Sequence, residues 1–203
     1  MQKKNTMNSA KRSTLLFETI RVSQFKACHL DFHLKRANAS TANGLHFDLA
    51  SLMHVPDDGL YRVKIIYDDN GYFIKKQCFA YKKRNIKSIC LLASDISYDK
   101  KYLDRRNIDD LFTRRGNCDE IIIIKNGLVT DTSIANIAIR SNNQWFTPRT
   151  PLLKGTTRQR LIAQKLLQEK DISVSELLNA EKIALMNAMT DFYEIEEIRF
   201  ETE

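Results

Sequence analysis

The stretch 119–158 reads DEIIIIKNGLVTDTSIANIAIRSNNQWFTPRTPLLKGTTR, and its first part predicts a β-hairpin. The run 121–124 is short, apolar and β-branched, which is typical of a buried strand. Asn126 and Gly127 follow it, and this pair is the strongest short-range hairpin signal, since both central residues of a type I′ turn need a positive φ. We therefore expect the return strand to begin at Leu128.

The return strand carries a carboxylate, Asp131, in an apolar setting. The apolar spacing of 129–139 predicts a strand that is buried on at least one face, so the Asp131 carboxylate needs a partner. A cationic ring nitrogen of a bound ligand would satisfy it. A simple turn residue after a hairpin strand is an equally good interpretation from the residues alone.

The end of the stretch predicts an anion site. Pro151 and Gly155 mark a loop, and Thr156 and Thr157 open a segment, RQRLIAQKLLQ, with the pattern of a helix. At a helix N-terminus the hydroxyls, the free N–H groups and the helix dipole all favour negative charge. We predict a phosphate site without a Walker motif, although an ordinary helix cap would use the same geometry.

Six short motifs extend this pattern over nearly the whole chain. In chain order they are L-F-E-T-I-R-V at 16–22, H-L-K-R at 33–36, K-Y-L-D-R at 101–105, V-T-D-T-S-I-A-N at 129–136, W-F-T-P at 145–148 and L-L-K-G-T-T-R at 152–158. Together they resemble the class IV aminotransferase family, the fold-type IV pyridoxal-phosphate enzymes that include branched-chain and D-amino-acid aminotransferases and aminodeoxychorismate lyase. The resemblance implies a two-domain α+β fold like that of D-amino-acid aminotransferase, with an N-terminal α/β layer domain and a C-terminal pseudo-barrel-like domain.

The resemblance assigns a cofactor lysine and a phosphate ligand. Lys101 opens K-x-L-x-R and matches the lysine that forms a Schiff base with pyridoxal 5'-phosphate, and its neighbour Lys100 is the alternative. Arg36 ends H-x-x-R and matches the arginine that binds the cofactor phosphate. From the residues alone, Lys101 would be a solvated lysine and Arg36 a residue on the polar face of a helix. We interpret His33 as structural.

The resemblance places the other cofactor contacts later in the chain. Asp131 stands where the family usually has a glutamate facing the pyridine nitrogen, and an aspartate, one methylene shorter, can also keep the ring protonated. Gly155, Thr156 and Thr157 match the second phosphate clamp. Asn187, in L-M-N-A-M, matches the last cofactor-facing turn loosely.

Length and composition fit a compact enzyme. The 203 residues are 43% hydrophobic and 28% charged, and no apolar run approaches the roughly 20 residues of a membrane span. The N-terminus, MQKKNTMNSAKRS, is basic but lacks the apolar core of a signal peptide. The four cysteines are scattered without a C-x-x-C pair, which argues against a zinc site and for reduced thiols. We expect a cytoplasmic protein without a metal.

The net charge of +7 raises the question of nucleic-acid binding. The basic clusters are spread along the chain among acidic residues and form no recognisable reader motif. An anionic cofactor and a small amino substrate carrying carboxylate would suit the same charge balance. We expect neither a nucleic-acid nor a membrane partner. Nucleic-acid binding stays an outside possibility, which an affinity that falls steeply with salt would reveal.

The chain divides into two units in this interpretation. Residues 1–12 are expected to be disordered, 13–93 to form an N-terminal α+β domain, 94–99 to be a linker, and 100–203 to form a C-terminal cofactor-binding domain.

Several elements are expected within these units. The first unit is expected to hold a strand at 14–22, a helix at 32–40, a hairpin about Asn70-Gly71 and a strand at 88–93. In the second unit we expect a helix through Leu103, Ile108, Leu111 and Phe112, then three strands, a helix, and the strands IALMNAM and FYEIEEIRF.

The resemblance implies one of two reactions. A lyase would eliminate pyruvate from 4-amino-4-deoxychorismate and give 4-aminobenzoate, a folate precursor, whereas an aminotransferase would move the amino group of a branched-chain or D-amino acid to a keto acid. We favour the lyase, because the K-x-L-x-R and N-A-M features resemble that branch and the tyrosine that aminotransferases often carry after the lysine is absent. An inactive scaffold that only binds is the outside alternative. The family also implies a homodimer.

Overall fold

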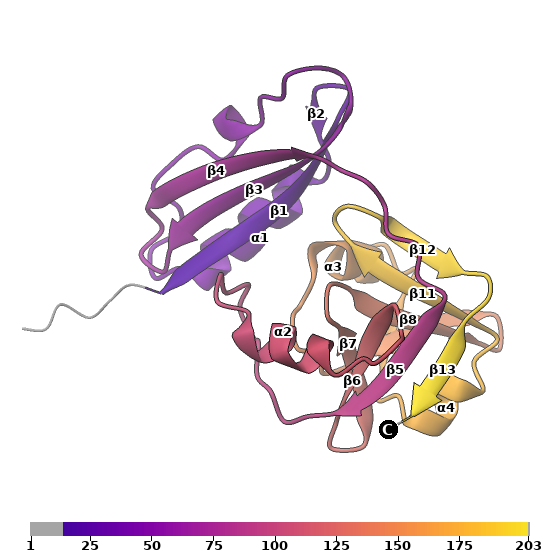
Figure 1. The fold of residues 1–203 in the computed structure, drawn as a ribbon. Coiled ribbons are helices and arrows are strands. Elements are labelled where there is room, and N and C mark those ends of the chain that lie inside the picture. The colour runs from indigo at the N-terminus through magenta and orange to yellow at the C-terminus, as the bar shows by residue number, and fades with distance from the viewer. Residues whose placement is uncertain (1–13, 203) are drawn as a thin grey trace, which may run out of the picture.

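A four-stranded antiparallel sheet forms the first unit of the computed structural model, which describes residues 14–202 (Figure 1). The strand order is β2-β1-β3-β4, with β1 at Leu15–Ser23, β2 at Lys26–Ala27, β3 at Leu60–Asp68 and β4 at Phe73–Ala80. The disorder expected for 1–12 lies outside the described residues.

One face of this sheet is covered and buries the apolar residues of its central strands. The helix α1 (Leu30–Ser40) and the short 3-10 helix η1 (Ala50–Leu52) cover it. Alternating residues of β1, such as Leu16 and Ile20, have no exposed surface, as expected for a strand with one face on a core.

The second unit is built on a larger, mixed sheet (Figure 1). Its strands follow the order β10-β9-β8-β7-β6-β5-β13, and β11 pairs with both β8 and β12. The bounds are Ser88–Ala93 (β5), Glu120–Lys125 (β6), Leu128–Thr132 (β7), Asn136–Ser141 (β8), Gln144–Pro148 (β9), Gln168–Lys170 (β10), Lys182–Asn187 (β11), Asp191–Ile195 (β12) and Arg199–Thr202 (β13). The helices are Arg106–Thr113 (α2), Thr156–Ala163 (α3) and Val174–Leu178 (α4). The predicted two-domain α+β fold is confirmed.

The predicted hairpin is present and positions Asp131. Strands β6 and β7 pair antiparallel, and Asn126 and Gly127 between them have φ angles of 53° and 76°. These are the two positive values that a type I′ turn requires. Asp131 is therefore the fourth residue of β7, next to the β8 strand that begins at Asn136.

Two boundary predictions are wrong, and tertiary pairing explains both. The strand 88–93, expected in the first unit, is β5 of the second sheet, where it pairs in parallel with β6 and β13. The sheets therefore change between β4 and β5. The segment FYEIEEIRF is two strands, because β12 pairs antiparallel with β11 and β13 pairs in parallel with β5.

Two helices are shorter than the pattern predicts. Leu103 lies outside α2, because its N–H donates to the Leu15 carbonyl at 2.8 Å and keeps this segment on β1. Helix α3 ends at Ala163, and the chain turns through Lys165, with φ of 59°, into β10. No helix among the described residues is long and apolar enough to cross a membrane.

Candidate active site

Glu18, on β1, is a fully buried carboxylate that binds two side chains of α1. Its Oε1 accepts a hydrogen bond from Arg36 Nε at 2.9 Å, and its Oε2 accepts one from Arg36 Nη2 at 2.5 Å. His33 Nδ1 lies 2.6 Å from the same Oε2. Burial raises the pKa of Glu18, but Arg36 and His33 outweigh burial and lower it to about 2. Glu18 is therefore ionised and fixes Arg36, leaving the Nη1 group of the guanidinium for another anion.

Lys100 and Lys101 have different surroundings. Lys100 Nζ donates a hydrogen bond to the Ser40 carbonyl at 2.9 Å and ties the segment before α2 to the end of α1. Lys101 Nζ lies 4.6 Å from the centroid of the Phe17 ring, and within residues 14–202 it has no hydrogen bond or ion pair. The Lys101 carbonyl accepts the Phe17 N–H at 3.0 Å, which fixes this residue against β1. Lys101 is the member of the pair with a free ammonium group.

The surroundings of Lys101 favour its neutral form. Burial lowers its pKa to about 7, helped by the positive charges of Arg36, Arg105 and Lys64 and opposed by Glu18. A lysine with a pKa near 7 is partly neutral at physiological pH, so its nitrogen can act as a nucleophile or as a base.

Asp131 belongs to a buried polar network that reaches the start of α3. Its Oδ1 accepts a hydrogen bond from Asn136 Nδ2 at 2.6 Å, and its Oδ2 accepts the Leu153 N–H at 2.8 Å. Asn136 Oδ1 in turn accepts the Gly155 N–H at 3.1 Å. Burial raises the pKa of Asp131 to about 7, although these donors act in the opposite direction. A cation placed against Asp131 would favour its ionised form.

Helix α3 begins without a side-chain cap. Thr156 and Thr157 are each 5% exposed, and neither hydroxyl has a hydrogen-bond partner in the described part of the chain. A Cβ atom on Gly155 would lie 2.1 Å from Asn136 Oδ1, so only glycine fits in front of the helix. The two hydroxyls and the N–H groups of the first turn are therefore available to an anion.

Arg158 anchors this turn and was not singled out from the sequence. Its side chain is fully buried, and Nη2 donates to the Pro148 carbonyl at 2.8 Å and to Glu169 Oε1 at 2.6 Å. Its charge also acts to lower the pKa of Asp131. Arg158 is the last residue of the motif L-L-K-G-T-T-R, and this position was the available signal in the sequence. The hydrophobic pattern around it does not indicate that its side chain is buried.

Two contacts bring the halves of the site together. Helix α1, which carries Arg36, packs against α3, which Thr156 opens (Figure 1). Arg105 Nη2 donates a hydrogen bond to the Ser133 carbonyl at 2.7 Å. Arg105 follows Lys101 by four residues, and Ser133 follows Asp131 by two. These contacts join the elements that carry Arg36 and Lys101 to the elements that carry Thr156 and Asp131.

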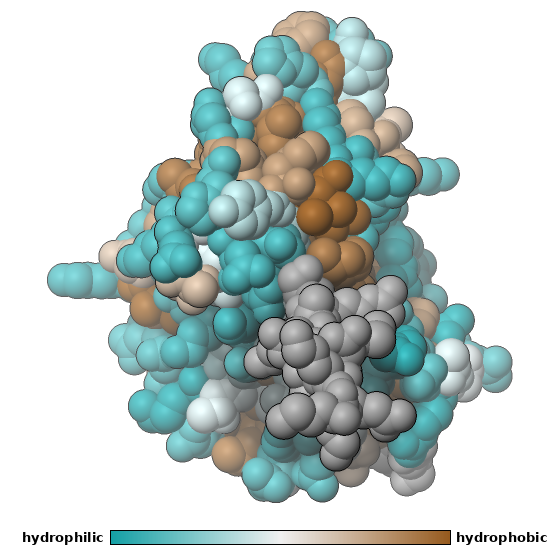
Figure 2. All heavy atoms as spheres, turned by 90° about the vertical axis from the view of Figure 1, so that its left-hand side faces the viewer, coloured by the Kyte–Doolittle hydropathy of each residue, from teal (hydrophilic) through white to brown (hydrophobic). Residues whose placement is uncertain are grey.

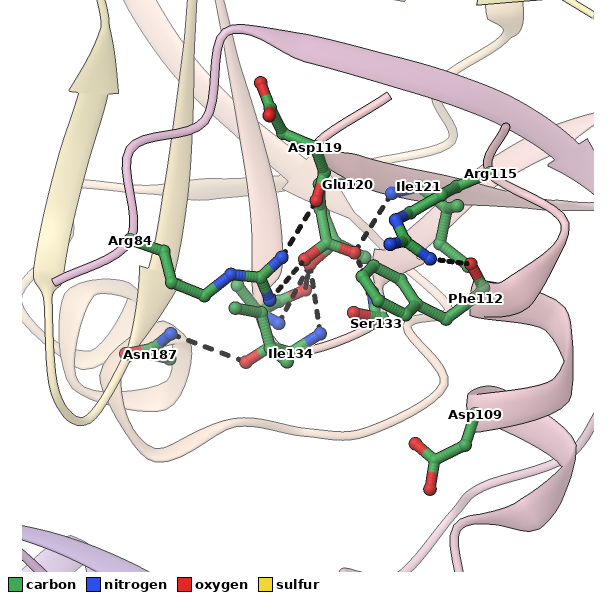
Figure 3. A network of polar contacts seen from close by, with 12 residues as sticks. Arg84, Asp109, Phe112, Arg115, Asp119, Glu120, Ile121, Ser133, Ile134 and Asn187 are labelled. Carbon is green, nitrogen blue, oxygen red and sulfur yellow. Dashed lines mark hydrogen bonds and ion pairs between the residues drawn. The ribbon is translucent and has the colours of Figure 1, made fainter. Parts of the chain in front are cut away.

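Glu120, a third buried carboxylate, supports the turn after Asp131 and also escaped sequence analysis (Figure 3). Its Oε1 accepts the Ser133 N–H at 3.2 Å and the Ile121 N–H at 3.0 Å. Its Oε2 has no hydrogen bond within the described residues and lies 3.6 Å from Arg84 Nη1. Glu120 and Arg84 thus hold the 132–135 turn to β6.

Asn187 organises the turn between β11 and β12. Its Oδ1 accepts the N–H groups of Met189 and Thr190 at 2.9 and 3.0 Å and the Thr190 hydroxyl at 3.1 Å. Its Nδ2 donates to the Ile134 carbonyl at 3.4 Å, which joins this turn to the turn after Asp131 (Figure 3). A direct cofactor contact of Asn187 stays a prediction.

A cleft of about 320 Å³ lies beside the β6–β7 hairpin, and none of the predicted site residues lines it. Its walls come from the segments 97–99, 125–130 and 150–152, which precede Lys101, Asp131 and Leu153 along the chain.

The chain is similar to several known proteins. Residues 100–198 match the model of the family described as amino-transferase class IV. An uncharacterized protein of Haemophilus influenzae is 37% identical over 184 residues, which are 86% of this chain and 97% of that protein. The solved structure of a "putative 4-amino-4-deoxychorismate lyase" from Haemophilus somnus 129PT is 36% identical, with a TM-score of 0.78 over 87% of this chain and 96% of that one.

A more distant structure shares the fold alone. It is the PLP-bound form of a hypothetical aminotransferase from Mycobacterium tuberculosis, with 18% identity and a TM-score of 0.70 over 92% of this chain and 82% of that one. The chain belongs to the class IV aminotransferase family of pyridoxal-phosphate enzymes.

Proposed function

We propose that this protein is a 4-amino-4-deoxychorismate lyase that uses pyridoxal 5'-phosphate and releases pyruvate and 4-aminobenzoate. The observation that carries the proposal is the similarity, at 36% identity over 96% of its length, to the Haemophilus somnus protein of that description. The product would place the enzyme in folate biosynthesis, and we expect it in the cytoplasm.

The donor set of the site fits the proposed cofactor. Lys101 would hold it covalently, Arg36 Nη1 with the start of α3 would bind its phosphate, and Asp131 would face its ring nitrogen. Among the described residues, the fit rests on a lysine without a hydrogen bond or ion pair, an uncapped helix with two unpartnered threonine hydroxyls, and a buried carboxylate whose pKa is raised to about 7. When bound, the cofactor supplies an electron sink that stabilises negative charge on the amine-bearing carbon.

The residues of this chain would carry the proton transfer. Neutral Lys101 Nζ takes the proton from the amine-bearing carbon, and the carbon–oxygen bond to the enolpyruvyl group breaks as the ring becomes aromatic. The leaving group departs as enolpyruvate, which becomes pyruvate. The pKa of about 7 suits Lys101 to this work, because general-base catalysis is most effective when the pKa is close to the working pH. A protonated ring nitrogen placed against Asp131 would keep its carboxylate ionised.

The decisive experiment follows both products of the PLP-loaded protein given 4-amino-4-deoxychorismate. We expect equal amounts of pyruvate and 4-aminobenzoate, and Lys101→Ala should lower the rate roughly 10²- to 10⁴-fold. Lys100→Ala, whose ammonium binds the Ser40 carbonyl, is the matched control and should keep most of the rate. Absence of pyruvate from wild type would contradict the proposal.

The alternative is a class IV amino-acid aminotransferase acting on a branched-chain or D-amino acid. It would require amino transfer to a keto acid, with the cofactor left in its amine form. Keto-acid production from such an amino acid, in the absence of pyruvate release, would favour it. An inactive binding scaffold is the weaker alternative, because candidates for the lysine, the phosphate arginine and the ring-nitrogen carboxylate are all present.

The surface of the first unit supports a homodimer. The edge strand β4 exposes Phe73, Ile74 and Phe79, each by at least 41%, and Figure 2 shows apolar side chains gathered on the upper part of this side of the molecule. Unpaired edges and apolar patches of this kind usually meet a partner. Sedimentation equilibrium should give twice the chain mass, and a fully active monomer would contradict the dimer.

A further inference from the structure

Lys64 is a half-buried cation on the central strand β3. In the antiparallel register with β1 it stands opposite Thr19, so it shares a sheet face with Thr19 and Phe17, not with Glu18. Its Nζ lies 4.5 Å from the centroid of the Phe17 ring. Lys101 Nζ lies 4.6 Å from the same centroid, so both ammonium groups share one aromatic ring.

Neither ammonium group has an anionic partner in the described part of the chain. Among residues 14–202, no carboxylate lies within ion-pair distance of Lys64 or Lys101. The buried carboxylate whose charge acts on Lys101, Glu18, is occupied by Arg36 and His33. Half-buried cations without a counter-ion are costly, so an arrangement that keeps two of them together points to a bound anion.

Arg105 adds a third positive charge to this group. It is held in place by the Ser133 carbonyl at 2.7 Å, and its only carboxylate partner among the described residues, Asp109, lies 3.5 Å away with 65% of its side chain exposed. Its charge acts on both Lys64 and Lys101 and lowers the pKa of each, after burial as the first cause. The three cations therefore lie close enough to act on one another.

We propose that Lys64 and Arg105 form a subsite for a carboxylate of the substrate, beside the lysine that reacts with its amine. The subsite rests on the proposed function and deepens it, since Arg36 and the start of α3 already account for the cofactor phosphate. A substrate that carries one carboxylate on its ring and a second on its enolpyruvyl group, as 4-amino-4-deoxychorismate does, can place one of them here. The subsite thus selects dicarboxylates over monocarboxylates.

The test measures binding without turnover. Calorimetric titration of the PLP-loaded protein with isophthalate, a ring dicarboxylate, and with benzoate, its monocarboxylate counterpart, gives two dissociation constants. Lys64→Met should weaken isophthalate about tenfold and change benzoate less than twofold, because one charge-assisted contact is lost. Lys64→Arg should keep most of the affinity. Lys75→Met, on the exposed edge strand β4, is the matched control for loss of one charge.

Three results would overturn the subsite. The first is an isophthalate affinity in Lys64→Met equal to that of wild type, and the second is an equal loss of affinity for isophthalate and benzoate. The third is a larger loss of affinity for pyridoxal phosphate than for isophthalate, which would mean that Lys64 binds the cofactor. The outcome is separable from the lyase assay. Pyruvate release with unchanged isophthalate binding rejects the subsite alone, and selective loss of isophthalate in a protein that releases no pyruvate rejects the lyase alone.

Discussion

Lys101 is a buried amine whose pKa is lowered to about 7. In the cofactor-free protein, protonation of this buried amine lowers the free energy of unfolding by an amount that depends on pH. Between pH 7 and 10.5 the unfolded chain binds a proton at this lysine that the folded chain does not, so the contribution of Lys101 to stability rises with pH. At pH 7 and below, the folded protein carries the full cost of the protonated amine.

Lys101→Met should therefore stabilise the cofactor-free protein. At pH 6.5 we expect the free energy of unfolding to rise by on the order of 2 kcal/mol, and the advantage over wild type to shrink as pH increases towards 10. Urea denaturation of both proteins across this pH range measures it. A variant that is less stable than wild type at pH 6.5 would show that Lys101 is not enclosed as described.

Glu18 has the opposite dependence. Its pKa in the folded protein is lowered to about 2 from the ordinary value of 4.5. Its contribution to the free energy of unfolding is therefore complete above pH 4.5 and is lost as pH falls towards 2. Glu18→Gln leaves Arg36 buried without its carboxylate, and we expect a loss of roughly 3 kcal/mol at pH 7. The difference from wild type should narrow between pH 4.5 and 2 in the same denaturation experiment. A difference independent of pH would contradict the ion pair.

At the scale of elements, the turn from β9 into α3 depends on Gly155. An added methyl group would meet Asn136 Oδ1 at 2.1 Å and displace the amide that donates to Asp131. Gly155→Ala should weaken pyridoxal-phosphate binding at least about tenfold, through overpacking and loss of these hydrogen bonds. Fluorescence titration with the cofactor measures the change.

Gly116→Ala is the control for this prediction. Gly116 has φ of 58°, and its added Cβ would meet no atom within 4 Å. This variant should lose some stability through backbone strain but keep its cofactor affinity. If both glycine variants bind the cofactor like wild type, the close contact between Gly155 and Asn136 does not serve the site.

The elements show what sequence could and could not predict. Local signals sufficed for the β6–β7 hairpin, where Asn126-Gly127 fixes both φ angles, and for α3, which Thr156 opens as expected. Boundaries failed where a distant strand decided the structure. Leu103 continues a helical pattern, but its N–H binds the Leu15 carbonyl. Strand β5 belongs to the second sheet because it pairs in parallel with β6.

The candidate site divides in the same way. Motif order pointed to Lys101, Arg36 and Asp131, because each lies in a recognisable local sequence. The side chains that hold them, Glu18 and Arg158, lie in the same motifs, yet their roles depend on burial and on partners far away in the chain. No periodicity within a single strand could have shown that Glu18 is fully buried and ionised.

At the scale of the whole molecule, the two units contribute different parts of the candidate site. The first unit holds Arg36 and Glu18, while the second holds Asp131 and the start of α3. Lys101 lies between β5 and α2 of the second unit and is bound through its carbonyl to β1 of the first. The central claim is that this lysine, and not Lys100, binds the cofactor.

Borohydride reduction of the protein incubated with pyridoxal phosphate tests this claim most directly. Before reduction we expect a visible absorption band, and after it a single phosphopyridoxyl peptide whose modified residue is Lys101. Lys100→Ala should give the same peptide, and Lys101→Ala should give none. Modification at Lys100, or the absence of any reducible adduct in wild type, would contradict the account.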